Sequence, residues 1–507
     1  MSATLPASGT RTARAAGAVH PGYRTLWRWH FYAGLFVMPF LVVLAITGTI
    51  YCFQPQIEPL LYPHRLVVTP QDAPRLPADT LLARAQASLP ADAKVIRAHI
   101  EANPARSAEF VFALANGSKE SVYLNPYSGE VLGTLDVDGR FMQIDRMLHR
   151  KLLLGKPGEL LMELAACWTL VMIGTGVALW WPRSTPGSKG PSLRAALWPR
   201  LGVTGRPFWK SLHSVIGIWL AVGALAFVVS GLPWTGSWGK QFKALATRVN
   251  AGAPRGAWGG GLPLKSALPG VQPGSQTASP DRSEHAGHDM SSMPGMVMDN
   301  LPLPNVPWAV GAMHVPQSPD AAQHTPARFT LDQVVASMRA LGVESGYDIA
   351  LPATPAGVYT VSYFPSDPQN ERTVYIDQYS GKVLKDIRYA DYGAVSQVIS
   401  YGTSLHMGRY FGLANQLICT AISLGLAALA VTGFVMWWLR RPTRTVGAPS
   451  RERAAPPMRA WKTGLAVLAV IFPLMGATIV AVLLLDRLFF GGPRNLSASC
   501  QSGRERQ

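Results

Sequence analysis

The sequence has few charged residues for its length. Only 15% of its 507 residues are Asp, Glu, Lys or Arg, whereas soluble proteins usually contain about 25%. The formal net charge is nevertheless +17, which in a soluble protein would suggest nucleic-acid binding. The basic residues instead gather in short segments beside apolar runs. We therefore interpret them as signals for orientation in a membrane, and we expect no nucleic-acid partner.

Cysteine is also scarce, and its spacing excludes several kinds of site. Cys52, Cys167, Cys419 and Cys500 form no CxxC or CxxCH motif, which argues against a zinc finger, a disulfide framework and covalently attached haem. Three of the four lie inside apolar runs, where cysteine usually serves as a small apolar residue. The sequence also lacks HExxH, GxSxG and P-loop motifs, so a hydrolase or nucleotide-binding protein has no support.

Long apolar runs, in contrast, are present. Five segments are long enough to cross a bilayer, which takes about 20 residues. The second reaches that length if its helix begins near Gly158 and includes Glu163. The first is too long for a signal peptide and is interpreted as an uncleaved anchor. The five segments are residues 31–53, 164–181, 211–239, 410–439 and 463–485.

Positive charge predicts the orientation of these segments. Residues 182–207 carry five Arg or Lys and no acidic residue, and residues 440–462 carry six Arg, one Lys and one Glu. Loops rich in Lys and Arg stay in the cytoplasm. We therefore predict a bacterial inner-membrane protein with a cytoplasmic N-terminus and, after a fifth span, a periplasmic C-terminus.

The predicted fold class is a polytopic α-helical membrane protein. It has a four-helix core of two repeats plus a fifth helix, and two periplasmic α+β domains. The predicted segments are 1–25 (cytoplasmic N-terminus), 26–53 (first span), 54–148 (first periplasmic domain), 149–182 (second span with a preceding histidine segment), 183–207 (cytoplasmic loop), 208–239 (third span), 240–327 (flexible Met/His-rich periplasmic segment), 328–400 (second periplasmic domain), 401–440 (fourth span with a preceding histidine segment), 441–461 (cytoplasmic loop), 462–488 (fifth span) and 489–507 (periplasmic tail).

Each predicted periplasmic domain combines a helix with strands. "PADTLLARAQASLP" has the apolar periodicity of a helix and precedes strand-like "AEFVFAL", "SVYLN" and "GEVLG". "TLDQVVASMRAL" likewise precedes "VYTVSYF", "TVYID" and "GKVLK". The stretches 121–133 and 373–385 match at seven of thirteen positions. Their shared Tyr-Ser-Gly predicts a hairpin turn between two strands.

The membrane segments repeat as well. His30 is followed by Thr47-Gly48 after 17 residues, and His213 is followed by Ser230-Gly231 at the same spacing. The other two core helices share a different pair of spacings. His149 and His406 each precede a Thr-Gly pair by 26 residues and a Trp-Trp pair by 31.

Four histidines at matched spacings favour haem ligation over isolated polar residues at the membrane interface. Neutral imidazole suits haem iron, and bis-histidine ligation needs two rings from different helices at one depth. We predict an inner pair, His30 with His213, near the cytoplasmic face, and an outer pair, His149 with His406, near the periplasmic face. Two haems so placed would form a path for electrons across the bilayer.

Two further considerations bear on these sites. Zinc is the alternative metal, but third and fourth ligands at helical spacing are missing. Gly34 and Gly217, each four residues after an inner histidine, lie on the same helix face as that histidine. They would leave room for a flat macrocycle or for a close helix contact.

The motifs resemble a known family. The repeated "YSGEVL" and "YSGKVL" turns look like PepSY domains. The Leu-His elements before membrane helices that end in "TGVALWWPR" and "TGFVMWWLRRP" look like PepSY-associated transmembrane proteins. The resemblance covers roughly residues 24–440. The family includes iron-regulated inner-membrane proteins and ferric-siderophore reductases.

The resemblance implies periplasmic PepSY-like domains over a four-helix core. Some members look like b-type dihaem reductases that pass electrons outward to release iron from siderophores. Carried over to this sequence, the two haem b ligand sets would be His30, His149, His213 and His406. The acceptor would be a periplasmic ferric chelate. The electron donor stays open between a quinol and a cytoplasmic reductase.

A Met/His-rich stretch suggests a second metal site. Thioethers and imidazoles suit Cu(I), although a low-complexity linker needs no metal. If this stretch binds copper, the protein is a copper-handling or copper-reducing membrane protein. A third alternative is a non-enzymatic scaffold that binds a peptide or protease. The candidate ligands are His285, His288, Met290, Met293, Met296 and Met298.

Overall fold

The computed structural model describes most of the chain, and two compact units make up the described part. The first unit comprises the segments up to residue 39, 164–222 and 428 onward; the second comprises 40–163 and 223–427. Every long helix of the core therefore contributes one part to each unit. The described residues are 22–181, 196–254, 297–318, 328–442, 447–449 and 457–490.

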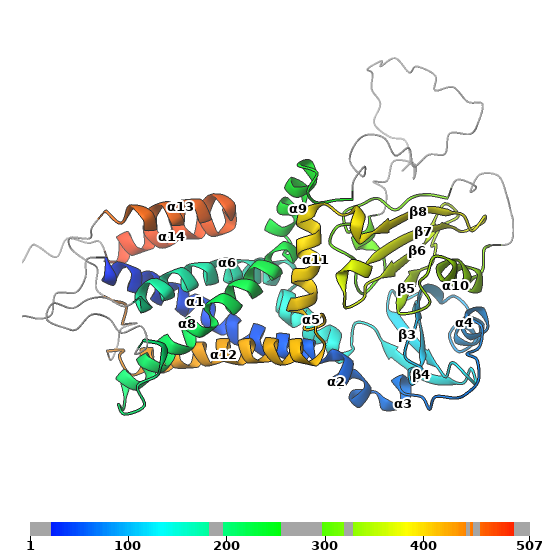
Figure 1. Cartoon of the computed structure of the whole chain (residues 1–507), viewed down its shortest axis with the longest axis horizontal. Coiled ribbons are helices and arrows are strands. Elements are labelled where there is room, and N and C mark those ends of the chain that lie inside the picture. The colour runs from blue at the N-terminus through cyan, green and yellow to red at the C-terminus, as the bar shows by residue number, and fades with distance from the viewer. Residues whose placement is uncertain are drawn as a thin grey trace, which may run out of the picture. The chain divides into compact units, whose positions relative to one another are not determined.

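Four described helices are long and apolar enough to cross a membrane. They are α1 (Tyr23–Cys52), α6 (Gly155–Trp180), α8 (Arg206–Gly231) and α12 (Leu413–Trp438) (Figure 1). Helices of the length and composition predicted for the four core spans are thus confirmed. As expected, α6 begins before Gly158 and includes Glu163. The buried Glu163 carboxylate accepts hydrogen bonds from the backbone N–H groups of Ser237 and Trp238.

The predicted fifth span is wrong as a single helix. Residues 459–490 form two helices that pack side by side, α13 (Arg459–Ile471) and α14 (Pro473–Phe490) (Figure 1). The chain turns at Phe472 (φ −120°, ψ 85°). Pro473 has no backbone N–H and disfavours a helical conformation in the residue before it. Gly476 lets the two helices approach closely, because a Cβ there would lie 2.7 Å from the carbonyl oxygen of Ala469.

Separate short helices carry the outer histidines. His149 lies in α5 (Phe141–Lys151), and His406 ends α11 (Ala394–His406). Between α5 and α6 the chain reverses through Leu152 and Leu153, both with positive φ, which is uncommon for residues other than glycine. Three more short helices lie in the second unit: α2 (Gln54–Leu61), α3 (Pro63–Leu66) and α9 (Trp238–Arg248).

All eight named strands form one antiparallel sheet in the second unit, in the order β4-β3-β2-β1-β5-β6-β7-β8 (Figure 1). The strands are β1 (Lys94–Ile100), β2 (Ala108–Ala113), β3 (Lys119–Leu124), β4 (Val131–Asp136), β5 (Tyr347–Ala350), β6 (Val358–Tyr363), β7 (Arg372–Asp377) and β8 (Val383–Arg388). Six of them match the predicted strands.

The two predicted periplasmic domains are instead two halves of this one sheet. The strands absent from the sequence prediction, β1 and β5, join the halves, with Ala98 opposite Ile349. One apolar core runs under both halves and includes Phe110 and Val374. Burial of apolar surface therefore couples the halves energetically.

Two helices cover the core and cap each other. The Asp79 carboxylate in α4 (Ala78–Ala87) accepts from the backbone N–H groups of Leu331 and Asp332. The Asp332 carboxylate in α10 (Leu331–Ala340) accepts from those of Ala78 and Asp79. Each helix thus satisfies free N–H groups at the start of the other, as a capping residue does within one helix.

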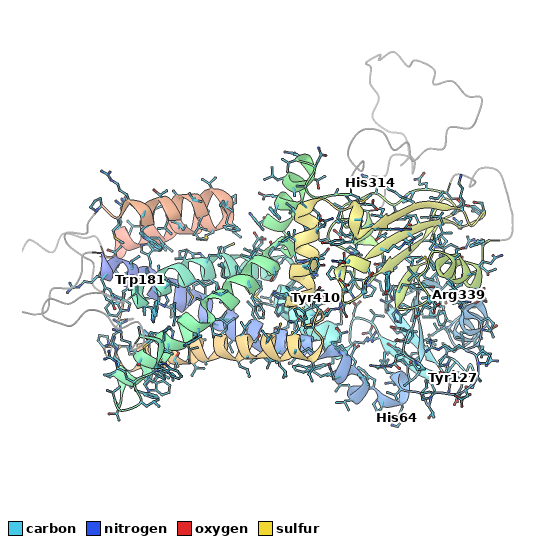
Figure 2. The ribbon with its side chains drawn as sticks, in the orientation of Figure 1. His64, Tyr127, Trp181, His314, Arg339 and Tyr410 are labelled. Atoms are coloured by element: carbon cyan, nitrogen blue, oxygen red, sulfur yellow. The ribbon has the colours of Figure 1, made fainter. Side chains whose placement is uncertain are left out.

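The repeated Tyr-Ser-Gly motif forms hairpin turns, as predicted. Gly129 (φ +73°) and Gly381 (φ +66°) adopt the left-handed conformation that favours glycine. Tyr127, labelled in Figure 2, lies in the first of these turns, between β3 and β4. Its backbone N–H donates to the side chain of Asn125.

A buried ionic network connects the sheet to α5. The Glu109 carboxylate on β2 accepts from Arg97 at 3.1 Å and from Arg140, the residue before α5, at 3.0 Å. Burial alone would raise the pKa of Glu109, but the two guanidinium groups outweigh it and lower the pKa to about 2. This network fixes the start of the helix that carries His149.

Candidate functional site

The His30 ring of α1 is held by a Thr-Gly pair of α6. Its Nδ1 lies 3.0 Å from Oγ1 of Thr175. Its Cε1 faces Gly176 so closely that a Cβ on this glycine would lie 3.3 Å away. Glycine is therefore what allows the ring edge to reach the α6 backbone.

His213 of α8 repeats the arrangement on α12. Its Nδ1 lies 2.9 Å from Oγ1 of Thr432. A Cβ on Gly433 would lie 3.5 Å from its Cε1. All the residues of these two contacts belong to the first unit.

The outer histidines use the same contact in the second unit. Nδ1 of His149 lies 2.8 Å from Oγ1 of Thr47 in α1. Nδ1 of His406 lies 2.9 Å from Oγ of Ser230 in α8. The glycine that follows each hydroxyl residue again faces Cε1 of the ring. The four contacts thus form one motif, a histidine against a Thr-Gly or Ser-Gly pair, which we call the hydroxyl–glycine cradle.

The cradle determines which ring nitrogen is available. The hydroxyl of Thr175 donates to the carbonyl of Val171 at 2.6 Å, and that of Thr47 donates to the carbonyl of Val43 at 2.7 Å. Thr432 and Ser230 do the same within their helices. A hydroxyl has one hydrogen, so in each cradle its oxygen accepts the Nδ1–H of the histidine. Nε2 then carries a lone pair and is the nitrogen that can bind a metal.

The two inner imidazoles lie close enough to hold one metal ion between them. The ring centroids of His30 and His213 lie 6.2 Å apart, with the rings at 84°. Imidazoles that bind one metal from opposite sides, each through a nitrogen about 2 Å from it, have centroids roughly 6 Å apart. The donor chemistry agrees, since a metal-bound histidine usually donates its other N–H to a fixed acceptor. The inner pair therefore fits a bis-histidine haem.

The outer histidines also lie near each other. Burial lowers the pKa of His149 to about 3, and the neighbouring His406 lowers it further. Burial likewise lowers the pKa of His406 to about 4. Both rings are therefore neutral, as metal ligation requires. The ring of Phe227 packs against His406 with a centroid distance of 4.9 Å.

The two glycines that lie four residues after the inner histidines differ in their surroundings. A Cβ on Gly34 would meet no atom within 4 Å, whereas a Cβ on Gly217 would lie 3.7 Å from Leu429. The space beside Gly34 agrees with room for a flat ligand. Gly217 is at an ordinary helix–helix contact.

Comparison with known families agrees with this architecture. A model of the PepSY-associated TM region matches residues 27–440. The chain belongs to this family. A search of the curated proteins finds no match. Membership of the PepSY-associated family, together with the four apolar helices, makes the chain a membrane protein.

Cationic side chains accompany the outer pair of this PepSY-associated protein. Arg150 follows His149 and donates to the carbonyl of Trp234 at 3.3 Å. Arg409, three residues after His406, donates to the carbonyl of Phe364 at 2.6 Å. Arg150 is exposed, whereas Arg409 is half-buried and its pKa is lowered by burial. Neither forms an ion pair with a carboxylate in the part of the chain that the structure describes.

Arg28, beside the inner pair, is engaged by the protein itself. It is buried and donates to the carbonyl of Pro449 and, at 3.0 Å, to the hydroxyl of Tyr32. Trp29 stacks on Trp168 with centroids 6.0 Å apart. Both residues therefore pack the first unit.

The predicted copper ligands are mostly beyond what the structure describes. Met298 is described, and it does not lie in a flexible segment. It is fully buried in an apolar cluster with Val310 and Tyr375 against the sheet, so its thioether packs the core. No group of three or more His, Cys, Asp or Glu side chains that could hold a metal ion occurs within the described ranges. His285, His288, Met290, Met293 and Met296 lie outside the described residues.

The sequence prediction located the four histidines but missed the partners that hold them. The Thr-Gly and Ser-Gly pairs were visible as repeated spacings. Their contacts cross between helices: His30 of α1 uses Thr175 of α6, and α1 supplies Thr47 to His149. Each histidine is thus held by a helix other than its own, and spacing along one helix cannot reveal which helix that is.

Proposed function

We propose that this protein is a membrane oxidoreductase that holds two haem b groups and passes electrons across the bacterial inner membrane. His30 and His213 would hold one group, and His149 and His406 the other. The observation that carries the proposal is the fourfold hydroxyl–glycine cradle, which fixes each ring and leaves its Nε2 free. When bound, haem supplies reversible one-electron chemistry at its iron.

The protein's own residues would position and tune these groups. Each cradle hydroxyl holds its imidazole in one tautomer and one orientation, which supports ligand basicity. The guanidinium groups of Arg150 and Arg409, close in sequence to the outer histidines, are suited to the carboxylate side chains of the outer haem, because arginine binds carboxylates through two parallel hydrogen bonds.

The proposed acceptor is a ferric chelate at the sheet-bearing side of the protein. This choice follows the resemblance to ferric-siderophore reductases together with the position of the outer pair in the same unit as the sheet. The proposed donor is a quinol or a cytoplasmic reductase at the inner pair. The PepSY-type sheet would then lie on the acceptor side of the electron path.

The decisive experiment is haem quantification with a reduced-minus-oxidised absorbance spectrum of the detergent-purified chain after haem-replete expression. We expect two b haems per chain. We also expect the reduced protein to be reoxidised quickly by a ferric chelate in stopped-flow measurements. A purified, folded chain without a Soret band would refute the proposal.

Single substitutions test the pairing. His30→Ala and His213→Ala should remove the same spectral component, and His149→Ala and His406→Ala should remove the other. The matched control is His64→Ala, because His64 is exposed in α3 (Figure 2); it should keep both components. Loss of one shared component in His30→Ala and His406→Ala would show that the pairing is wrong.

A further inference from the structure

Two cysteines meet beside the outer histidine. Cys52 ends α1 and Cys419 lies near the start of α12, so the pair joins the two repeats. The two thiols lie near each other. Both also point at the carbonyl oxygen of His406, with Sγ at 3.9 Å for Cys52 and 3.8 Å for Cys419. Both cysteines are buried and form no disulfide with each other in this structure, as the sequence interpretation of small apolar side chains expects.

The two cysteines have different hydrogen-bond donors beside them. The side-chain amide of Asn415 donates to Sγ of Cys419 at 3.3 Å, and that of Gln416 donates to the carbonyl of Cys52 at 2.8 Å. The Asn415 amide thus holds the Cys419 sulfur itself, whereas the Gln416 amide holds the backbone beside Cys52. We therefore assign Cys419 as the attacking sulfur and Cys52 as the sulfur that resolves it.

We propose that Cys52 and Cys419 are a redox-active dithiol that a small peroxide converts to a disulfide. The Cys419 thiolate attacks one oxygen of hydrogen peroxide, which breaks the O–O bond, gives a sulfenic acid and, with a proton, releases water. The Cys52 sulfur then attacks the Cys419 sulfur and displaces a second water. In total, two thiols and one hydrogen peroxide give one disulfide and two waters.

The burial of the pair selects the size of the oxidant. Cys52 is 5% exposed and Cys419 is 2% exposed. Exchange with a protein disulfide requires the attacking and leaving sulfurs to come into contact, which this burial prevents. A small neutral peroxide can reach the site through local fluctuations of the helix ends.

The disulfide would act on the end of α11. In the dithiol form, the Cys419 thiol donates to the carbonyl of Leu405 at 3.3 Å, and the thiols lie against the His406 carbonyl. Oxidation removes both S–H donors and ties α1 to α12. On the proposed function, this shifts the potential of the outer haem and leaves the inner one unchanged. Formation of the disulfide itself does not depend on haem.

The test uses the full chain in detergent with Cys500→Ser as background, which removes a thiol outside the described residues. The protein is treated with a small excess of hydrogen peroxide, alkylated with N-ethylmaleimide under denaturing conditions, digested and analysed by mass spectrometry. We expect a peptide linked through Cys52 and Cys419 that disappears after dithiothreitol. Cys167→Ser, at a buried cysteine of α6, should still give the linked peptide, whereas Cys52→Ser and Cys419→Ser should not.

Full alkylation of both cysteines after peroxide, or oxidation of Cys419 beyond sulfenic acid without a link, would overturn the proposal. If a serine variant does not fold, the chain that keeps both Cys52 and Cys419 is compared with and without dithiothreitol. That comparison is enough to decide whether the linked peptide forms. A linked peptide in a chain that binds no haem would support the dithiol and refute the oxidoreductase. A normal dihaem spectrum without a linked peptide would support the oxidoreductase and refute the dithiol.

Discussion

A hydroxyl group holds each of the four histidines, where many metal sites use a carboxylate. The reason lies in the surroundings of the sites. A carboxylate within a membrane helix costs free energy that a hydroxyl does not, because a Ser or Thr hydroxyl can donate to the carbonyl four residues earlier in its own helix. Thr175 makes this bond to Val171. The same oxygen still accepts from the ring of His30.

Replacing one cradle hydroxyl should therefore weaken one site selectively. In Thr175→Val, the Nδ1–H of His30 loses the hydroxyl acceptor while the side-chain volume is kept and the backbone carbonyl of Met172 stays within reach of the ring. We expect roughly tenfold weaker haem retention at the inner pair, as for other partners of metal ligands. The measurement is haem content and the difference spectrum after a dilution wash.

Thr169→Val is the matched control for this prediction. Its hydroxyl is also buried in α6 and donates to the carbonyl of Ala165 at 2.8 Å, within its own helix. Equal haem loss in Thr169→Val and Thr175→Val would contradict the proposed role of the cradle.

The cradle glycine offers an equally local prediction. In Gly176→Ala, the new Cβ would lie 3.3 Å from Cε1 of His30, so the ring must shift by a few tenths of an ångström. We expect several-fold lower haem occupancy at the inner pair. Gly174→Ala gains the same helix propensity, about 1 kcal/mol, and meets no atom within 4 Å. Similar spectra for the two variants would show that the ring tolerates the shift.

At the scale of elements, α11 links the sheet to the outer pair. The hydroxyl of Ser400 in α11 donates to the carboxylate of Glu371 at 2.9 Å. Glu371 directly precedes β7 and is 2% exposed. Burial raises the pKa of Glu371 to about 7, although Ser400 and Arg409 partly oppose the rise.

This raised pKa predicts how stability depends on pH. Glu371 has a pKa near 4.5 when unfolded, so between pH 4.5 and 7 the folded state binds more protons. Stability should therefore fall as pH rises through that window, by about 3 kcal/mol in total. Glu371→Gln keeps an acceptor for Ser400 and removes the titration, so its unfolding temperature should change less between pH 5 and 8. Glu344→Gln, at an exposed position, should follow the unsubstituted protein; equal slopes in all three would refute the prediction.

At the scale of the whole molecule, the sheet and the core helices contain matched elements, and the α13–α14 pair follows them in the chain. The two halves of the sheet share one core through β1 and β5. The two core-helix pairs carry equivalent cradles. The α13–α14 pair has no counterpart among the described helices. It packs in the first unit, where Trp168 of α6 donates to the hydroxyl of Thr478 at 3.0 Å.

The turn at Phe472 predicts the membrane topology of the C-terminal part. If α13 and α14 enter and leave on one side, reporters fused after residues 457 and 490 should lie in the same compartment. We expect green fluorescent protein and alkaline phosphatase fusions at the two positions to give the same pattern of activity. Fusions after Lys151 and Trp181, which flank the span α6, serve as the pair that should differ. Opposite patterns at 457 and 490 would show that the chain crosses the membrane once between them, as a single fifth span does.

Much of this architecture could be predicted from local sequence. Spans α1, α6, α8 and α12 followed from apolar length, and the Tyr-Ser-Gly hairpins followed from glycine at turns with positive φ. Strands β1 and β5 were missed. The first, "KVIRAHI", carries Arg97 and His99 on one face, where they serve the ionic network instead of a solvent-facing pattern. The second has only four residues.

The sequence by itself determined which residues repeat. It singled out the four histidines, the hydroxyl–glycine pairs and the apolar spans, because each depends on spacing along one chain segment. Only the tertiary structure decided what those residues contact. The cradles join positions 145, 102, 219 and 176 residues apart, and Cys52 meets the carbonyl of His406 across 354. Periodicity cannot encode such pairs, because they arise from helix packing and from the burial of polar groups that must find partners.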